Sequence, residues 1–191
     1  GFFARGGKVV IVDRDAAAGE ALAASLGASA LFRTADVTKS ADVAAYVKAA
    51  LDRFGAIDCF HNNAGIEGRV ARLAEYDEAV FDQIMAVNVK GVFLGVQSIF
   101  KAMQARGGGS IIITSSVAGI KGASMLAPYV TSKHAVIGLM RSAALAGAEH
   151  NIRVNTVNPS PVETRMMRSL EEGMMPEDLN AAHDMMSANI P

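Results

Sequence analysis

The stretch Ser-Ile-Ile-Ile-Thr-Ser-Ser at residues 110–116 decides the fold of this chain. Three consecutive isoleucines are typical of a strand that is buried on both faces, as in a parallel sheet covered by helices. The hydroxyl side chains after them stand where this strand ends. Because open α/β sheets bind ligands at the carboxyl ends of their strands, we expect Ser116 to face a ligand.

The rest of the chain repeats this pattern of short apolar strands separated by segments with helical periodicity. Strands are expected at residues 8–12, 30–34, 57–61, 110–114 and 152–157, and helices at 16–26, 40–54, 77–106 and 127–149. In the second helix, Ser40 is a candidate N-cap and Gly55 a candidate terminator. Strands and helices that alternate in this way form right-handed βαβ crossovers. The pattern therefore predicts a doubly wound, Rossmann-like α/β fold, in which helices cover both faces of a parallel sheet.

Composition limits the classes of protein to which the chain can belong. Its 191 residues, 51% of them hydrophobic, predict a single domain over residues 1–191. With 18 basic and 19 acidic residues and no basic run, the chain has no signature of nucleic-acid binding. No apolar run approaches the roughly 18 residues of a membrane span, and no Cys/His cluster has metal-ligand spacing. The single cysteine, Cys59, favours a reducing, cytoplasmic location.

Asp13 ends an apolar strand, as does the acid that binds the adenosine ribose in dinucleotide-binding sheets. The glycine fingerprint of such sheets lies roughly 20 residues before this acid, which places it, with the first strand, before residue 1. In the strand order 3-2-1-4-5-6, the first strand occupies the centre of the sheet. We therefore expect the chain to be truncated at both ends and to lack the first and the final strand. A solvated acid in a turn is the alternative for Asp13.

Tyr129 and Lys133 lie four residues apart, so a helix places them on one face, and Tyr129 lies 13 positions after Ser116. A phenol with a reference pKa of about 10 is a poor base at neutral pH, but a nearby cation stabilises the phenolate. Lys133 can supply this cation, and Ser116 can hold a substrate oxygen as charge develops on it. An isolated pair at this spacing would instead indicate an exposed tyrosine beside a solvated lysine.

Five motifs occur in an order that resembles the short-chain dehydrogenase/reductase family. They are Asn62-Asn63-Ala64-Gly65, Asn88-Val89-x-Gly91, Ser116, Tyr129-x-x-x-Lys133 and Asn158-Pro159. The resemblance extends over essentially the whole chain. It implies an NAD(P)-dependent enzyme that transfers a hydride between a nicotinamide cofactor and a secondary alcohol or ketone.

The resemblance also implies roles for individual residues. Tyr129 is the implied catalytic acid/base, Lys133 lowers its pKa and binds the nicotinamide ribose, and Ser116 orients the substrate. Asn88 is implied to position a proton-relay water; a helix-interior asparagine with local hydrogen bonds and a kink is the other interpretation, and the two are compatible. Asp36 is implied to accept from the adenine amino group, with a helix-entry acid as the alternative. The implied cofactor-binding residues are Asp13, Arg14, Asp36, Val37, Asn63, Ala64, Gly65, Tyr129, Lys133, Pro159, Val162 and Thr164.

The loop after the last expected strand departs from the family pattern. The family usually has Pro-Gly there, whereas in this chain Ser160 and Pro161 follow Pro159. Ser160 carries a Cβ where glycine is usual, and Pro161 lacks an amide donor and stiffens the loop. Val162 and Thr164 remain the expected contacts on the nicotinamide side.

Asp13 favours NAD over NADP as the cofactor. Its carboxylate accepts hydrogen bonds from free ribose hydroxyls and repels a 2′-phosphate. Arg14, the next residue, would attract that phosphate. We expect the acid to dominate, and therefore NAD.

Residues 165–191 form an expected substrate lid that is rich in methionine. Methionine lines adaptable apolar pockets as readily as it fills helix packing, so both interpretations stay open. The expected substrate is a small or medium apolar secondary alcohol or its ketone. One alternative is a 3-oxoacyl group on a carrier protein, which requires a basic patch to which Arg165 and Arg168 could belong. Another is a catalytically silent dinucleotide sensor on the same fold.

The expected helices at 77–106 and 127–149 carry more apolar surface than one face of a sheet can cover. This surface includes Phe81, Met85, Val89, Ile137 and Met140. We therefore expect the helices to mediate homo-oligomerisation, as a tetramer or a dimer, which are the states that the resemblance implies.

Overall fold

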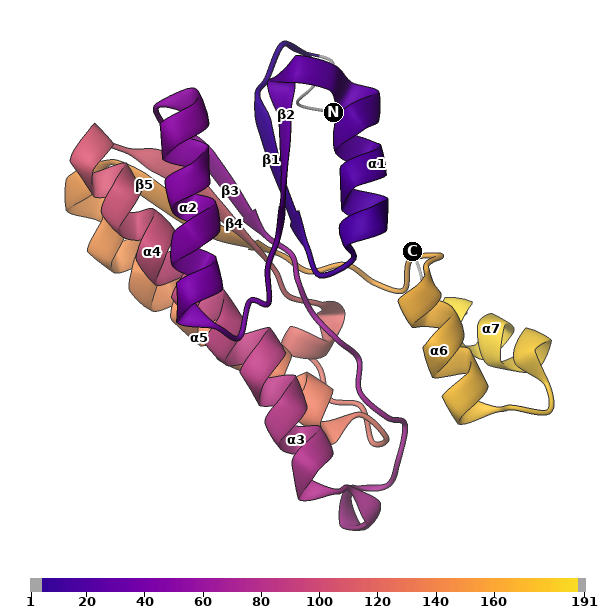
Figure 1. Cartoon of the computed structure of the whole chain (residues 1–191). Coiled ribbons are helices and arrows are strands. Elements are labelled where there is room, and N and C mark those ends of the chain that lie inside the picture. Colours follow the sequence, from indigo (N-terminus) through magenta and orange to yellow (C-terminus); the bar gives the residue numbers. More distant parts are fainter. Residues whose placement is uncertain (1–4, 189–191) are drawn as a thin grey trace.

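The isoleucine-rich stretch forms the middle strand of a three-stranded parallel sheet. The structure is a computed structural model and describes residues 5–188. In it, β4 (Gly109–Thr114) lies between β3 (Cys59–Asn62) and β5 (Ile152–Val157). The remaining elements are β1 (Val9–Asp13), β2 (Ala30–Thr34), α1 (Ala16–Leu26), α2 (Ser40–Phe54), α3 (Glu78–Met85), α4 (Val92–Arg106), α5 (Ala127–Gly147), α6 (Arg165–Met174) and α7 (Leu179–Ser187) (Figure 1).

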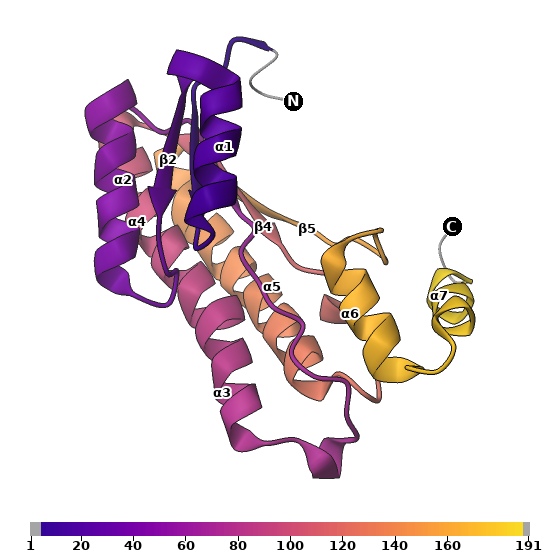
Figure 2. The ribbon, with the colours of Figure 1, turned by 45° about the vertical axis from the view of Figure 1, so that its right-hand side comes forward.

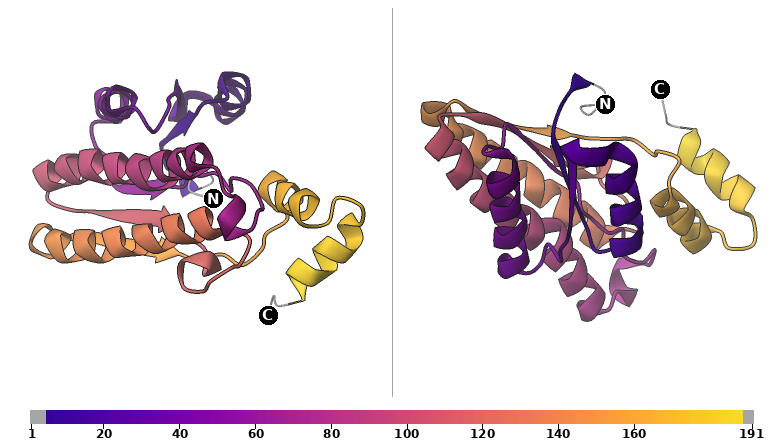
Figure 3. Two further views of the ribbon diagram at one scale, coloured as in Figure 1. Left: turned by 90° about the horizontal axis from the view of Figure 1, so that it is seen from below. Right: turned by 45° about the horizontal axis from the view of Figure 1, so that its top comes forward.

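Strands β1 and β2 pair in a second parallel sheet, separate from β3–β4–β5. α1 and α2 lie on opposite sides of this pair (Figures 1 and 3). α4 contacts all three strands of the larger sheet, and it also packs against α2 and α5. Parallel strands joined by helices confirm the predicted doubly wound, Rossmann-like class, and the division between the two sheets falls where the first strand was expected.

Side chains of the larger sheet alternate between a buried and an open face. Ile111, Ile113, Ile152 and Val154 are at most 3% exposed and pack with α4 and α5 in the main core. On the opposite face, the side chain of His61 is exposed, like those of its neighbours Cys59, Arg153 and Asn155. In the part of the chain that the structure describes, helices therefore cover both faces of β1–β2 but mainly one face of β3–β4–β5.

The single helix expected over residues 77–106 is interrupted. Between α3 and α4, Ala86–Gly91 form a π-helical turn, in which backbone hydrogen bonds join residues five apart instead of four. Two smaller differences concern helix ends. Ser40 begins α2 but does not cap it, because the N-cap position belongs to Lys39, which makes no side-chain capping bond. Gly55 ends α2 in the left-handed conformation, as predicted.

One stretch among the described residues, Glu78–Arg106, is long and apolar enough to cross a membrane by length and composition. The core helix of a compact fold meets the same criterion. Here Val96, Ile99 and Met103 of this stretch are buried in the main core with the isoleucines of β4.

Helices α6 and α7 form a separate pair beside the strand ends. They pack against each other, and Figure 2 shows them set apart from α1–α5. Residues 165–188 of the predicted lid segment are therefore a two-helix unit, while residues 189–191 lie outside the described part.

Candidate active site

A cleft of about 820 Å³ opens at the carboxyl ends of the strands. Doubly wound sheets bind their ligands at this edge. The cleft is lined by every predicted site residue except Asn88, namely Asp13, Arg14, Asp36, Val37, Asn63, Ala64, Gly65, Ser116, Tyr129, Lys133, Pro159, Val162 and Thr164. Residues predicted from distant parts of the sequence therefore share one site, and Asn88 is buried behind it.

Lys133 is buried in the cleft wall, with 5% of its surface exposed. Its Nζ donates to the backbone carbonyl of Thr114 at 2.9 Å and lies 5.4 Å from the centre of the Tyr129 ring. The end of the isoleucine strand thus positions the ammonium group beside the phenol. Burial lowers the pKa of Lys133 from 10.5 to about 8, so the group remains mostly charged at neutral pH.

Tyr129 is a protonated phenol at neutral pH. Burial raises its pKa above 10, a hydrogen bond with Ser116 opposes the rise, and the negative charge of Glu67 adds to it. The sequence-based expectation was a lowered pKa, so the described arrangement differs in direction, because desolvation of the phenolate outweighs its stabilising contacts. A phenol in this state is poised to donate a proton.

Ser116 occupies the end of the strand that positions Lys133. Its backbone is extended, and its Oγ accepts from the N–H of Ala118 at 3.1 Å, which starts the 3₁₀ turn Val117–Gly119. A hydroxyl can still donate while it accepts. Ser116 can therefore donate to a substrate oxygen held next to Tyr129.

Asn88 is 1% exposed and clamps three segments together. Its Oδ1 accepts from the N–H of Ile66 at 2.8 Å, and its Nδ2 donates to the carbonyl of Ile66 at 2.8 Å and to Ser132 Oγ at 3.1 Å. The side-chain hydrogen bonds of Asn88 therefore reach beyond its own helix, and the helix is also interrupted at this position. Because Ser132 lies between Tyr129 and Lys133 on α5, this amide ties the loop after β3 to the helix that carries the reactive groups.

The other end of the cleft presents two aspartates. Asp13 Oδ1 accepts from the N–H of Asp15 at 3.0 Å. Asp36 Oδ1 accepts from the Thr38 side chain at 2.7 Å and from its N–H at 3.0 Å, and these bonds lower the pKa of Asp36. Asp36 thus orders the turn ahead of α2 and also lines the cleft.

The floor of the cleft between these ends is backbone. A Cβ on Gly65 would lie 3.3 Å from Asn88 Oδ1 and 3.6 Å from Lys133 Nζ, so glycine keeps the space beside the ammonium open. Carboxylates at one end, a bare backbone floor and a buried lysine at the other fit an extended dinucleotide.

The predicted lid segment, residues 165–191, follows Thr164, whose Oγ1 accepts from the N–H of Met167 and caps α6. Its apolar side chains Met166, Met167, Leu170, Met174 and Met186 line the cleft. This favours the pocket interpretation of those methionines over helix packing alone, although Met175 and Met185 are exposed and do not line it.

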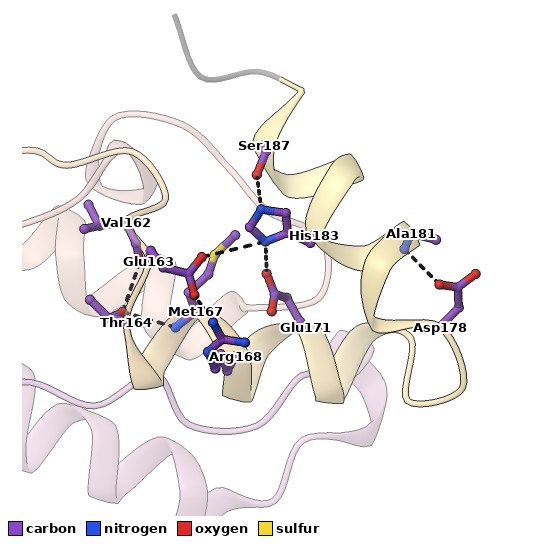
Figure 4. Close-up of polar contacts among 10 residues, drawn as sticks. All are labelled: Val162, Glu163, Thr164, Met167, Arg168, Glu171, Asp178, Ala181, His183 and Ser187. Carbon is purple, nitrogen blue, oxygen red and sulfur yellow. Dashed lines mark hydrogen bonds and ion pairs between the residues drawn. The ribbon is translucent and has the colours of Figure 1, made fainter.

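A polar cluster holds the two lid helices together (Figure 4). His183 Nδ1 of α7 lies 2.7 Å from Glu171 Oε1 of α6, and Arg168 pairs with Glu163. The bond with Glu171 raises the pKa of His183. The lid therefore has its own internal polar contacts, independent of the cleft wall.

Sequence reasoning missed three contributors to the site. Thr114 supplies the carbonyl that holds Lys133, and Ser132 accepts from Asn88 while donating to the carbonyl of Tyr129. Glu67, 7% exposed, carries the charge felt by Tyr129. A strand-end carbonyl gives no sequence signal, but an acid two residues after Gly65 of the cleft floor is a signal that could have identified Glu67.

Comparison with known proteins agrees with this geometry. Residues 1–175 match the family described as short chain dehydrogenase. Levodione reductase of Leifsonia aquatica is 36% identical over 97% of this chain and 72% of its own length. Sex determination protein tasselseed-2 of Zea mays is 42% identical over 87% of the chain, which spans 51% of that protein. A 2,5-dichloro-2,5-cyclohexadiene-1,4-diol dehydrogenase of Sphingobium indicum is 40% identical over 94% of the chain and 73% of its own length.

The solved structures that are similar to this chain are those of proteins of the same kind. The crystal structure of levodione reductase superposes with a TM-score of 0.91 at 36% identity, covering 95% of this chain and 72% of that one. The NADH complex of 3-ketoacyl-(acyl-carrier-protein) reductase from Brucella melitensis gives 0.78 at 37% identity, covering 82% and 66%. This chain belongs to the short-chain dehydrogenase family. The predicted family, and with it the class of oxidoreductases acting on alcohols and ketones, is confirmed.

Proposed function

We propose that the protein interconverts a secondary alcohol and its ketone with Tyr129 as the acid/base. One observation carries the proposal: in a single cleft, Lys133 Nζ is held 2.9 Å from the Thr114 carbonyl oxygen and 5.4 Å from the Tyr129 ring centre, beside Ser116. Proton transfer to a substrate oxygen requires such a donor, with a hydrogen-bonding neighbour for that oxygen and a cation nearby.

Each residue has one task in this mechanism. When bound, the nicotinamide cofactor supplies or accepts the hydride. In ketone reduction, Ser116 donates a hydrogen bond to the carbonyl oxygen, and Tyr129 gives it the proton that completes the alcohol. Lys133 stabilises the phenolate left behind. In alcohol oxidation, the phenolate form of Tyr129 takes the hydroxyl proton, so oxidation is favoured as the pH rises and reduction as it falls.

NAD is the proposed cofactor in preference to NADP. Asp13 and Arg14 both line the cleft, and Asp13 is oriented by the N–H of Asp15. The carboxylate repels a 2′-phosphate and accepts from free ribose hydroxyls. The family neighbour from Brucella melitensis was solved with NADH, which supports the same choice.

An apolar alicyclic alcohol or ketone is the proposed substrate. The lid contributes thioethers and Leu170 to the cleft, and flexible thioethers adapt to bulky apolar shapes. One relative is a dehydrogenase of a chlorinated cyclohexadiene diol. A carrier-bound 3-oxoacyl substrate is less well supported, because Arg165 and Arg168 already pair with Glu67 and Glu163 and contribute little net charge toward an acidic carrier.

A turnover panel tests this proposal. Steroid, sugar, aliphatic and alicyclic secondary alcohols are offered with NAD or NADP, and nicotinamide absorbance is followed. We expect alicyclic alcohols to turn over with kcat/KM at least about tenfold higher for NAD, which corresponds to roughly 1.4 kcal/mol. Cofactor binding without turnover of any alcohol would identify the protein as a dinucleotide sensor, and higher kcat/KM with NADP would reverse the assignment of Asp13.

We also propose self-association through α4 and α5. Phe93 of α4 is 45% exposed and Leu145 of α5 is 80% exposed, and large exposed apolar groups on neighbouring helices suit an interface between copies. Light scattering at working concentration should give the mass of a dimer or tetramer. A monomer mass would contradict this.

A further inference from the structure

Glu67 is a buried carboxylate that the proposed proton transfer does not require. It follows the cleft floor in sequence and is 7% exposed. Its Oε1 lies 3.5 Å from Nη1 of Arg165, whose side chain is 80% exposed. Burying a carboxylate is costly unless a partner compensates. The pair therefore needs an explanation, and Arg165 is the first residue of lid helix α6.

The backbone on the Glu67 side of this ion pair is rigid. Both backbone groups of Ile66, the preceding residue, are bound by the amide of Asn88, which also binds Ser132 on α5. The backbone next to Glu67 is thus anchored to the same framework as Tyr129. A lid that moves relative to Glu67 therefore also moves relative to the Tyr129 phenol.

The lid approaches the same loop at a second point. A Cβ on Gly173 of α6 would lie only 2.8 Å from Cγ2 of Val70, so α6 lies against the loop after β3 at both ends of the helix. The internal contacts of the lid, such as His183 with Glu171, do not involve this loop (Figure 4). The lid can therefore dock or undock as a unit.

The charge of Glu67 acts on the Tyr129 phenol, whose pKa it raises. The other charged groups around this part of the cleft are Lys133 on α5, Lys121 in the loop after β4, and Arg165 on α6. Asp13, Arg14 and Asp36 lie at the opposite end, at the ends of β1 and β2. Among the described residues, no carboxylate lines the phenol end of the cleft, and the negative charge that acts on Tyr129 is that of Glu67.

We propose that the Glu67–Arg165 pair is a latch that docks the lid onto the catalytic floor, with Glu67 as the positioning residue. The inference rests on the proposed role of Tyr129 as acid/base. Closure of the lid therefore also changes the charge that acts on the Tyr129 phenol. Arg165 screens the Glu67 charge when the lid is docked and exposes it when the lid leaves.

Three variants separate the latch from the charge: Glu67→Gln, Arg165→Gln and the matched packing control Gly173→Ala. The chain has three tyrosines and no tryptophan, so the difference in tyrosinate absorbance between each variant and its Tyr129→Phe double mutant gives the Tyr129 titration without turnover. Hydrogen exchange of the lid helices reports docking, also without turnover. Kinetics on an accepted alcohol are measured in parallel.

We expect Glu67→Gln to lower the Tyr129 titration midpoint by about half a pH unit, because a negative charge is lost, and Arg165→Gln to raise it, because the charge is left unscreened. Both should reduce lid protection about tenfold and raise KM more than they lower kcat. Gly173→Ala should reduce lid protection and raise the midpoint, as Arg165→Gln does, because an undocked lid leaves the Glu67 charge unscreened.

Two results would overturn the inference. An unchanged midpoint in Glu67→Gln, or a lowered midpoint in Gly173→Ala, removes the charge role. Unchanged lid protection in both ion-pair variants removes the latch. If no alcohol is turned over, the proposed function fails, but the titration and exchange results still decide the two structural claims.

Discussion

Tyr129→Phe should lower kcat for ketone reduction by about 10³-fold, within the range that general acid catalysis contributes. The substitution removes only the hydroxyl that gives up the proton, and leaves the ring beside Lys133 Nζ. KM and cofactor affinity should change little, since the ring still fills the cleft wall. Steady-state kinetics measures kcat and KM, and a fluorescence titration measures the affinity for the cofactor.

Tyr76→Phe is the matched control. The Tyr76 hydroxyl donates to backbone carbonyls of Arg69 and Met125 and does not line the cleft. Its loss should affect stability slightly and leave kcat within a few-fold of the parent. Retained turnover in Tyr129→Phe would show that the proton comes from another group and would remove the proposed mechanism.

Lys133→Met should stabilise the fold at pH 7 while it removes activity. Burial lowers the pKa of Lys133 to about 8, which means that at pH 7 the folded state carries a desolvated charge at a cost of about 3 kcal/mol. Methionine has similar length and no charge. After subtracting roughly 1 kcal/mol for the lost bond to Thr114, a net gain of about 2 kcal/mol is expected, with kcat at least about 100-fold lower.

The pH dependence has a definite sign. Between about pH 8 and 10.5 the unfolded chain keeps a proton on Lys133 that the folded protein has lost, so the parent becomes more stable as the pH rises through this window. The advantage of Lys133→Met should therefore be full below pH 8 and shrink toward pH 10.5. Urea unfolding at several pH values measures it.

Lys48→Met is the control for the loss of a lysine as such. Lys48 is 74% exposed and pairs with Asp52 on the surface of α2, so its loss should change stability by less than about 0.5 kcal/mol at any pH. If Lys133→Met is less stable than the parent at pH 7, the ammonium is a net stabiliser and the burial argument is wrong.

Local chemistry explains which parts of the fold the sequence could predict. The boundaries of α1, α2, β2 and β5 match their predicted ranges, because strand and helix periodicities change sharply there and Gly55 ends α2 by its own backbone preference. The cap at Ser40 was wrong, because Asp42, two residues later, accepts from the N–H of Asp36 and helps to fix the chain ahead of the helix. Several residues within three positions of the start of a helix can serve as its N-cap, and the sequence does not distinguish them.

In the active site, the properties that could not be predicted are those that depend on residues far apart in the chain. Ser116, Tyr129 and Lys133 were predictable because spacing and residue type encode their roles. The direction of the Tyr129 pKa was not, since it depends on desolvation and on Glu67, which is 62 positions away in the chain. The partner of Asn88 was not predictable, because it is Ile66, 22 residues earlier, whereas a kink at Asn88 was among the expectations.

The π-helical turn at Ala86–Gly91 also has a geometric effect on the core. A regular helix repeats a direction after about 18 residues, or five turns, so the face of Ile84 would return near residue 102. The deeply buried residue is instead Met103. One additional residue has been absorbed by the wide turn, and the apolar stripe of α3 continues along α4 in phase with the sheet. The π-helical turn that presents the Asn88 amide thus also rotates α4 relative to α3. As a result, one face of the helical stretch stays directed at the sheet over about twice the length of an ordinary helix.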